Sequence, residues 1–214
     1  MSTGPLPTAA DALAALASNE GWNHNTHYHR LIPRCAPPPY RRVLDVGCGE
    51  GLLTRRLAPL AGHVTGIDLS APMIERARAL ADADHLTYVC GDVLTTDLDG
   101  PFDLVTAFAT LHHMDLAAGL RRLKNLTAPG GTLLVVGLAR ARTPVGLVLG
   151  AAGVPANRWA QRRRGSWDPG APTLDAATTD RQVRAAARVS LPGSSVRSRL
   201  YWRYSLVWHA PSWA

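Results

Sequence analysis

Cysteine is scarce in this 214-residue chain. Its three cysteines, Cys35, Cys48 and Cys90, are an odd number without paired spacing. That pattern favours neither a disulfide framework nor a zinc site. We therefore expect no metal centre, and a protein that works in the reducing cytoplasm.

Long apolar runs and a leader sequence are also missing. No stretch approaches the roughly 18–20 apolar residues that a membrane span requires. Residues 1–10 lack the basic segment before an apolar one that a secretory signal would have. We therefore expect no membrane association. The 46% hydrophobic and 18% charged residues are ordinary for a globular domain.

Lysine is nearly absent, because Lys124 is the single one and arginine supplies the other basic residues. The formal net charge of +7 leaves nucleic acid or an acidic substrate open as partners. Abundant Ala, Gly, Pro and Arg are also typical of a GC-rich genome, and we favour this explanation of the charge. A nucleic-acid partner is therefore not favoured, and the composition leaves the oligomeric state unknown.

The chain does contain a regular alternation of short apolar runs and amphipathic segments. Near-continuous apolar strands separated by helices are typical of a parallel sheet that is covered on both faces. The pattern predicts an α/β fold, doubly wound, with a mostly parallel sheet of seven strands and helices on both faces. The expected strands are 43–46, 63–69, 86–90, 102–108, 132–136 and two within 195–209.

The segments outside this alternation are less regular. Residues 1–40 contain an expected helix over 8–17 and are assigned to an N-terminal helical lid segment, which leaves residues 41–214 as the main domain. Within that domain, residues 139–179 are rich in Pro, Gly and Ala. They predict a variable, irregular insertion with one short helix.

The strongest local feature is the glycine-rich loop Asp45-Val46-Gly47-Cys48-Gly49-Glu50-Gly51, which follows a strand and opens a helix. Glycines there allow a sharp turn and let a ligand contact the backbone, and the helix N-terminus offers free N–H groups. Leu52 stands where a dinucleotide fingerprint needs Gly or Ala, and the G-K-[ST] ending of a P-loop is missing. The loop therefore predicts a ligand site of another kind.

This loop resembles motif I of the class I S-adenosylmethionine (SAM)-dependent methyltransferases, in which an acidic residue precedes G-x-G-x-G. Four later segments resemble further motifs of the family, in the family's order: 66–70, 91–92, 102–114 and 126–133. The resemblance covers residues 42–137. It implies a Rossmann-like domain, SAM as the cofactor and methyl transfer as the activity.

The resemblance also implies which residues hold SAM. Asp68 matches the acid that accepts hydrogen bonds from the ribose hydroxyls, and Asp92 the acid that accepts one from the adenine amino group, while Asp45 should orient the methionine ammonium. Cys48 is expected in the loop as a small residue rather than as a nucleophile, because no base is arranged to activate it. The expected cofactor-binding residues are Asp45, Gly47, Cys48, Gly49, Asp68, Leu69, Asp92, Val93 and Phe108.

Two groups of residues are candidates for handling the methyl acceptor. His112 and His113 follow the fourth expected strand, where donor and acceptor should meet, and histidine can take a proton near neutral pH. We assign both as candidate catalytic bases, with ordinary packing as the alternative. A lid or acceptor contact is assigned to the aromatic and histidine residues before the first strand, with a plain surface helix as the alternative. These residues are Trp22, His24, His27 and Tyr28.

Missing motifs narrow the acceptor. The chain lacks the Asp-Pro-Pro-Tyr-like motif of amino-methylating DNA enzymes after its fourth expected strand, and the Pro-Cys nucleophile of pyrimidine C5 enzymes. A single lysine cannot supply the lysine-rich tetrad of ribose 2′-O enzymes. We therefore expect methyl transfer to an O or N atom of a small molecule, in secondary metabolism.

Two other functions stay open. An RNA methyltransferase would use basic residues to follow phosphates and neighbouring aromatics to stack bases. A partner subunit or cyclase-like protein would keep the SAM fold without methylating, because a fold does not prove a function. The basic residues available for RNA are Arg162, Arg163, Arg164, Arg197, Arg199 and Arg203.

Overall fold

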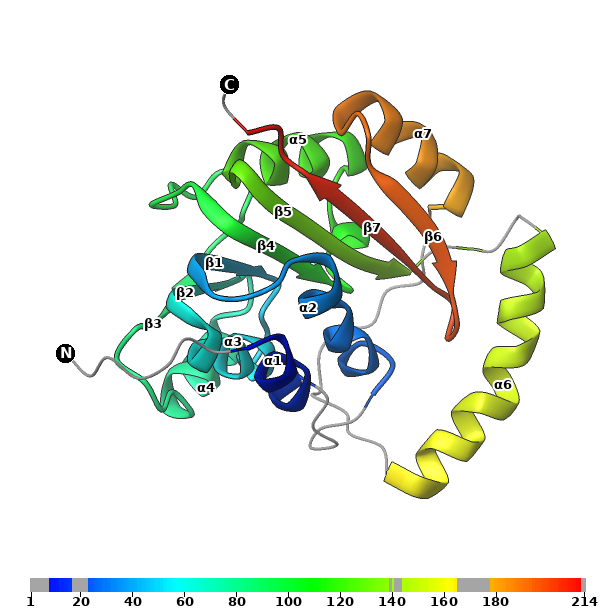
Figure 1. Ribbon diagram of the computed structural model, residues 1–214, viewed down its shortest axis with the longest axis horizontal. Helices are drawn as coiled ribbons and strands as arrows, with labels where there is room; N and C mark the ends of the chain where they lie inside the picture. Colours follow the sequence, from blue (N-terminus) through cyan, green and yellow to red (C-terminus); the bar gives the residue numbers. More distant parts are fainter. Residues whose placement is uncertain (1–7, 17–22, 139, 141–143, 165–177, 213–214) are drawn as a thin grey trace.

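A seven-stranded sheet forms the centre of the protein in a computed structural model, which describes residues 8–16, 23–138, 140, 144–164 and 178–212. Its strand order is β3-β2-β1-β4-β5-β7-β6. Strands β1 to β5 run parallel, and β7 pairs antiparallel with both β5 and β6 (Figure 1). The predicted mostly parallel, seven-stranded sheet is thus confirmed. The strands are β1 (Tyr40–Val46), β2 (Ala61–Asp68), β3 (Leu86–Cys90), β4 (Phe102–Phe108), β5 (Thr127–Leu138), β6 (Ser195–Arg199) and β7 (Arg203–His209).

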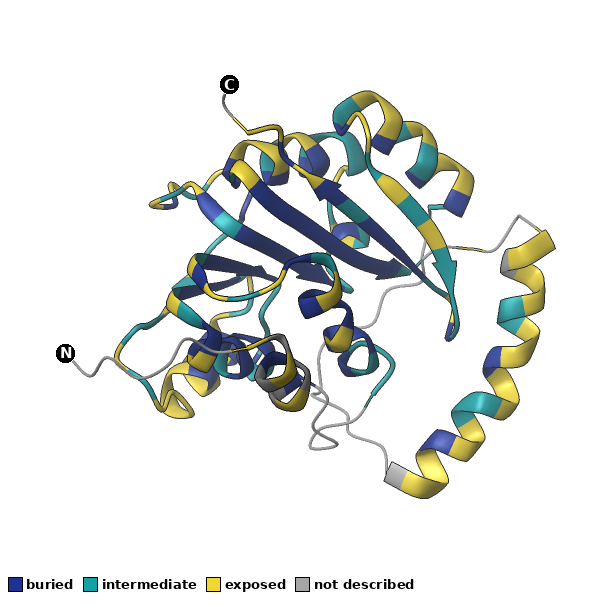
Figure 2. Cartoon of the chain, in the orientation of Figure 1, coloured by how far each residue is buried: buried dark blue, intermediate teal, exposed yellow. Residues whose placement is uncertain are grey.

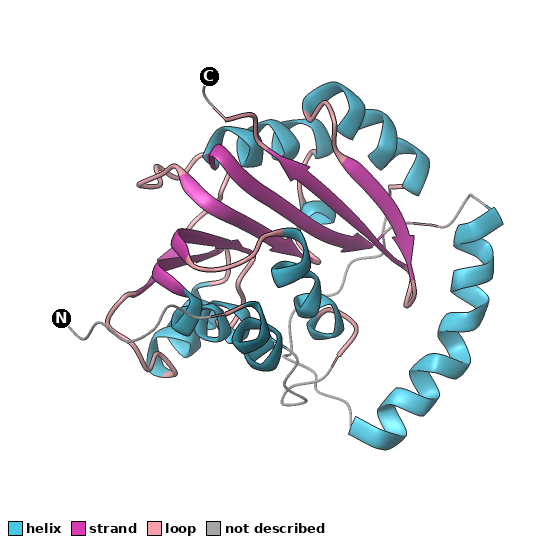
Figure 3. Cartoon of the chain, in the orientation of Figure 1, coloured by secondary structure: helices cyan, strands magenta, loops and turns pink. Residues whose placement is uncertain are grey.

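Helices cover both faces of this sheet (Figure 3). Successive side chains of a strand point to opposite faces. In β5, Leu133 and Val135 therefore pack into one apolar cluster with α5 and α7, whereas Leu134 and Val136 pack into another with α1, α2 and α3. The central strands are accordingly buried between the two layers (Figure 2). The helices are α1 (Ala9–Leu16), α2 (Ile32–Cys35), α3 (Leu52–Leu57), α4 (Ala71–Ala79), α5 (Leu116–Leu126), α6 (Pro144–Arg164) and α7 (Asp180–Ser190), with a 3₁₀ helix at Thr26–Leu31.

Side-chain caps explain where two of these helices begin. The Asp115 carboxylate accepts a hydrogen bond from the Ala118 N–H at 2.7 Å and so caps α5. Thr179 and Gln182 form a capping box at the start of α7. Such caps satisfy N–H groups that the first turn of a helix leaves free. They orient the helices whose apolar sides cover one face of the sheet.

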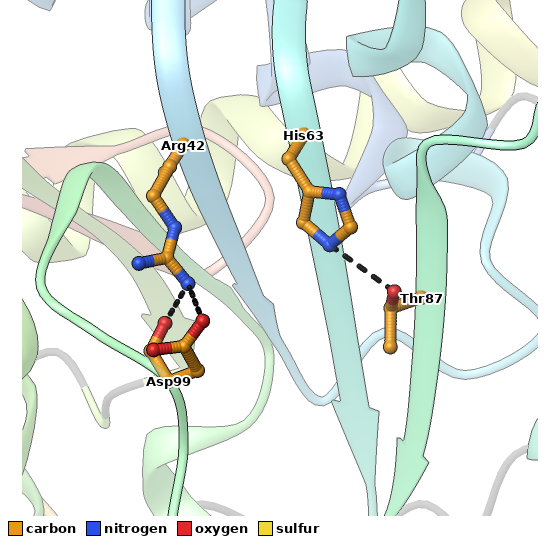
Figure 4. A network of polar contacts seen from close by, with 4 residues as sticks. All are labelled: Arg42, His63, Thr87 and Asp99. Carbon is orange, nitrogen blue, oxygen red and sulfur yellow. Dashed lines mark hydrogen bonds and ion pairs between the residues drawn. The ribbon is translucent and has the colours of Figure 1, made fainter.

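Polar contacts lie near the amino-terminal ends of the parallel strands (Figure 4). Arg42 in β1 forms an ion pair with Asp99 at 2.9 Å and also donates to the Asp99 carbonyl. A 3.1 Å hydrogen bond joins His63 of β2 to Thr87 of β3. These contacts are exposed, so they add little stability. They belong to the edge of the sheet opposite the glycine loop.

The region after β5 differs from its prediction. An irregular insertion with one short helix was expected over 139–179, but residues 144–164 form one helix of 21 residues, α6, with Pro155 inside it. The many Ala, Leu and Arg residues favour a helix and outweigh the glycines that suggested a loop. Helix α6 lies at the outside of the molecule beside β6 (Figure 1). Within the described ranges, no helix is long and apolar enough to span a bilayer.

Candidate functional site

A cavity of about 820 Å³ lies at the carboxyl ends of the parallel strands. The strand order reverses between β1 and β4, and ligands of open α/β sheets bind at such a switch point. The loops after β1, β2, β3 and β4 form part of the wall, and residues 23–26 and 29 form another part. Three residues from later elements complete it: Leu138, Gln161 and Arg203.

Every residue expected to bind the cofactor lines this cavity, as do His24, His112 and His113. The structure therefore brings together motifs that lie far apart in the sequence. His27 and Tyr28 do not line the cavity, and Trp22 lies outside the described residues. The residues expected to bind the cofactor, all of which line the cavity, are Asp45, Gly47, Cys48, Gly49, Asp68, Leu69, Asp92, Val93 and Phe108.

The glycine loop needs its glycines for different reasons. Gly47, Gly49 and Gly51 have φ angles of +69°, +55° and +76°, which other residues adopt at a cost. A Cβ on Gly47 would lie 2.0 Å from the Thr110 hydroxyl oxygen, and one on Gly51 would lie 2.5 Å from that of Tyr88. A Cβ on Gly49 would meet no described atom within 4 Å. Gly47 and Gly51 thus make room for the protein itself, whereas Gly49 leaves its backbone open to a ligand.

Two carboxylates beside this loop are held by backbone N–H groups. The Asp68 carboxylate accepts hydrogen bonds from the N–H groups of Gly49 and Ser70, both at 2.9 Å. Asp92 accepts one from the N–H of Leu94 at 2.9 Å. Each carboxylate oxygen has two lone pairs, so Asp68 keeps acceptor capacity on both oxygens. Its fixed position suits a ligand with two neighbouring hydroxyl groups.

Asp45 is almost completely buried under the same loop, with 2% of its surface exposed. Its two oxygens accept hydrogen bonds from the hydroxyls of Thr54 and Thr106, each at 2.9 Å. Burial raises the pKa of Asp45 to about 6, although both hydroxyls work against this shift. A cationic ligand group would favour the ionised carboxylate. Burial also raises the pKa of the Cys48 thiol, which makes that residue a poor nucleophile.

The two histidines near the end of β4 lie against one another, with their rings tilted by 38°. The ring centroids of His112 and His113 are 4.0 Å apart. Burial, and secondarily the nearby His113, lowers the pKa of His112 to about 4. His112 Nδ1 is buried and has no hydrogen-bond partner among the described residues. A buried polar atom of this kind usually has a partner, so His112 offers a neutral imidazole to a bound molecule.

The residues expected to form a lid have separate roles. His24 lines the cavity, stacks on Tyr201 with ring centroids 5.0 Å apart, and shares a 2.8 Å hydrogen bond with Asn157 of α6. Tyr28 is buried, and its hydroxyl donates to the Leu200 carbonyl at 2.8 Å. Tyr28 therefore anchors the segment to the β6–β7 turn. His24 is the member of the group that faces the site.

His29 also lines the cavity, although it was not among the residues assigned to the lid or acceptor contact. It is buried, its Nδ1 lies 3.2 Å from an Arg56 nitrogen, and its ring contacts Phe108 edge-on. Burial lowers the pKa of His29 to about 3. Because arginine can only donate, Nδ1 accepts, and the proton of the neutral ring sits on Nε2. The sequence signal for His29 was its position among the histidine and aromatic residues before the first strand.

Arg203, at the start of β7, also lines the cavity, although it was not expected in this site from the sequence. Its Nε donates to the Asn25 side-chain carbonyl at 3.1 Å, and Nη1 donates to the Tyr201 carbonyl at 3.2 Å. Burial lowers the pKa of Arg203 to about 10. The antiparallel pairing of Arg203 with Leu138 brings this side chain to the carboxyl edge. The sequence alone does not fix that register.

Comparison with known proteins gives relatives along nearly the whole chain. A family model described as a methyltransferase domain matches residues 43–131. An uncharacterized methyltransferase of Mycobacterium tuberculosis is 36% identical over 196 residues, which are 90% of this chain and 99% of the relative. A ubiquinone biosynthesis O-methyltransferase of Xanthomonas campestris is 39% identical over 162 residues, covering 68% of this chain and 66% of that protein.

A solved structure supports the fold. The N-methyltransferase NodS from Bradyrhizobium japonicum, in complex with S-adenosyl-L-homocysteine (SAH), matches with a TM-score of 0.60 and 16% sequence identity. The match covers 95% of this chain and 98% of the other. At that identity the likeness concerns the fold alone. It extends well beyond the motif region of residues 42–137.

Proposed function

This chain belongs to the class I SAM-dependent methyltransferases, with SAM as its cofactor, and on that basis we propose that it methylates an oxygen or nitrogen atom of a small molecule. One observation carries the proposal. Beyond the cofactor residues, the cavity is lined by a second group of residues, which we treat as its second region: 23–26, 29, 109, 110, 112–114, Gln161 and Arg203. Concave sites of this kind suit small molecules.

The residues of the first region fit SAM. Gly49 leaves open space over its backbone, and Asp68 is held ready to accept from two hydroxyls. Asp45 can balance an ammonium group, and Asp92 with Val93 can hold an aromatic base. When bound, SAM supplies a methyl group on a positively charged sulfur, which is already electrophilic.

The protein's part in the reaction is then chiefly to align the acceptor. Holding two reactants in line can supply much of the rate enhancement. We assign His112 to hydrogen-bond the acceptor's hydroxyl or amine group, since its ring is neutral at pH 7 and its Nδ1 has no described partner. His113 lines the same wall and is the second candidate base.

The structure gives less support to RNA as the acceptor. Of the five arginines considered for RNA whose side chains the structure describes, Arg203 alone lines the cavity. Arg199 instead donates to the Ser205 hydroxyl at 2.9 Å. The relatives also include an enzyme named for ubiquinone biosynthesis, which favours a small molecule. We propose secondary metabolism and the cytoplasm as the setting, in keeping with three free cysteines.

Calorimetric titration with SAM, SAH and NAD tests the cofactor assignment. We expect SAM and SAH to bind and NAD not to bind, and Asp68→Ala to weaken both adenosyl ligands by about 1–3 kcal/mol, as when hydrogen bonds to a charged group are lost. Asp82→Ala, on an exposed loop, is the control and should bind normally. Unchanged affinity in folded Asp68→Ala would refute the assignment.

Acceptor screening tests the reaction itself. Incubation with labelled SAM and a small-molecule library should transfer label to an O or N atom of one class of compound. Transfer to RNA instead, with a binding constant that falls steeply with salt, would favour the nucleic-acid alternative. Binding of SAM without transfer to any compound would favour the non-methylating alternative.

A further inference from the structure

The two regions of the cavity differ in charge. All four carboxylates that line it, Asp45, Glu50, Asp68 and Asp92, belong to the loops that hold the cofactor or follow them directly. Glu50 also forms an ion pair with Arg76, with 2.7 Å between Oε2 and Nη2. The other region, residues 23–26, 29, 109, 110 and 112–114 with Gln161 and Arg203, has no described carboxylate in its wall. It presents histidines, amides and one cation.

That cation, Arg203, has unused hydrogen-bonding capacity. Its guanidinium carries five N–H groups, and two of its nitrogens donate to Asn25 and Tyr201. Its Nη2 donates to no described residue. Arg203 forms no ion pair with any acid in the described part of the chain. A largely buried charge without a counter-ion is costly.

The neighbours of Arg203 do not offset its charge. Burial lowers the pKa of both His24 and His112, and the positive charge of Arg203 lowers both further. Neither ring can offset the charge of Arg203, because a histidine side chain is either neutral or cationic. Asn25 turns its side-chain carbonyl toward the guanidinium and so holds it in place. The charge that would complete this group is an anion within the cavity.

We propose that the methyl acceptor carries an anionic group, a carboxylate or a phosphate, which the Arg203 guanidinium binds. This inference rests on the proposed function and names the class of its substrate. Arginine suits both anions, because its planar N–H groups match two oxygens at once. Arg203 would then fix one end of the acceptor while the atom to be methylated lies toward the histidines of the β4 end. Its role is to position the acceptor and to select it.

Small probes of matched shape test this proposal by binding, without turnover. We would titrate benzoate, phenyl phosphate and neutral benzamide into the full-length protein saturated with SAH, at pH 7.5, by calorimetry. At least one anion should bind about tenfold or more tightly than benzamide, the lower end expected for hydrogen bonds to a charged group. The stronger of the two identifies the anion as carboxylate or phosphate.

Variants of Arg203 test whether this side chain is responsible for the preference for anions over benzamide. Arg203→Gln should bring the anions to within about twofold of benzamide, and Arg203→Lys should keep part of the preference, because it keeps the charge without the planar fork. Arg197→Gln is the matched control, because Arg197 lies on the same hairpin but not in the cavity wall. If Arg203→Gln fails to fold, the wild-type comparison of anions with benzamide still decides.

Three results would overturn the proposal. The wild-type protein could bind benzamide as tightly as both anions, it could bind neither anion, or folded Arg203→Gln could keep the preference. Each would show that Arg203 does not select an anionic acceptor. Failure of the proposed function looks different, because SAH would then not bind before any probe is added, or labelled SAM would transfer its methyl group to no small molecule.

Discussion

Asp45 is the residue whose protonation state should affect ligand binding most directly. Burial places the pKa of Asp45 at about 6, above its ordinary value. The carboxylate is ionised above that pH and can balance the methionine ammonium of SAM or SAH. Below it, the neutral acid cannot. We therefore predict that SAH affinity falls as the pH is lowered through about 6, by up to about tenfold per unit.

Calorimetry between pH 5 and pH 8 checks this prediction. Asp45→Asn should bind SAH more weakly than the wild type at pH 8 and should lose most of the pH dependence. Asp82→Asn, on an exposed loop, should keep the wild-type profile. A profile in Asp45→Asn that matches the wild type would assign the titration to another group.

At the scale of elements, substitutions in the glycine loop between β1 and α3 can distinguish effects on stability from effects on ligand binding. Gly49 and Gly130 both have positive φ angles and open space around a hypothetical Cβ, but Gly49 alone lines the cavity. Gly49→Ala and Gly130→Ala should therefore lose similar stability, about 1–2 kcal/mol each from the left-handed backbone. Gly49→Ala should in addition weaken SAH binding.

Gly47→Ala completes this series. It should be the least stable of the three variants, because its Cβ would also overlap the Thr110 side chain. Urea unfolding measures the three stabilities and calorimetry the affinities. Wild-type SAH affinity in Gly49→Ala would mean that no ligand approaches this backbone.

The predictions from sequence match the structure best where a local sequence pattern determines the secondary structure. The apolar runs predicted the strands. The family resemblance predicted Asp45, Asp68 and Asp92 as cofactor residues, and the structure brings them to one edge of the sheet because each lies at or just after the carboxyl end of a parallel strand. Helix α6 was missed because its Pro and Gly residues suggested a loop. Arg203 was not placed in the site because its position depends on the antiparallel register of β7, a long-range property without a local pattern.

At the scale of the whole molecule, His29 links stability to pH. Burial holds the pKa of His29 near 3, whereas an unfolded histidine titrates near 6.5. The unfolded chain thus binds a proton that the folded chain does not, and stability falls as the pH decreases from about 6.5 toward 3. Between pH 7 and pH 5, the contribution of His29 should be about 2 kcal/mol.

Urea unfolding at pH 7 and pH 5 measures this loss. His29→Gln keeps an acceptor for Arg56 but cannot titrate, so it should lose about 2 kcal/mol less than the wild type over the same interval. His63→Gln, on the exposed start of β2, should behave as the wild type does. Equal losses in the wild type and in His29→Gln would contradict the buried, neutral state of His29.

The hydrogen bond between Asn25 and Arg203 joins positions 178 residues apart. Part of the wall on the proposed acceptor side, formed by residues 23–26, His29 and Arg203, therefore comes from near the two ends of the chain, while the residues assigned to the cofactor all lie between 45 and 108. These parts of the site can diverge in evolution as separate stretches of sequence. We expect divergence in the first 30 residues and the last hairpin to change which molecule is methylated, with the methyl donor unchanged.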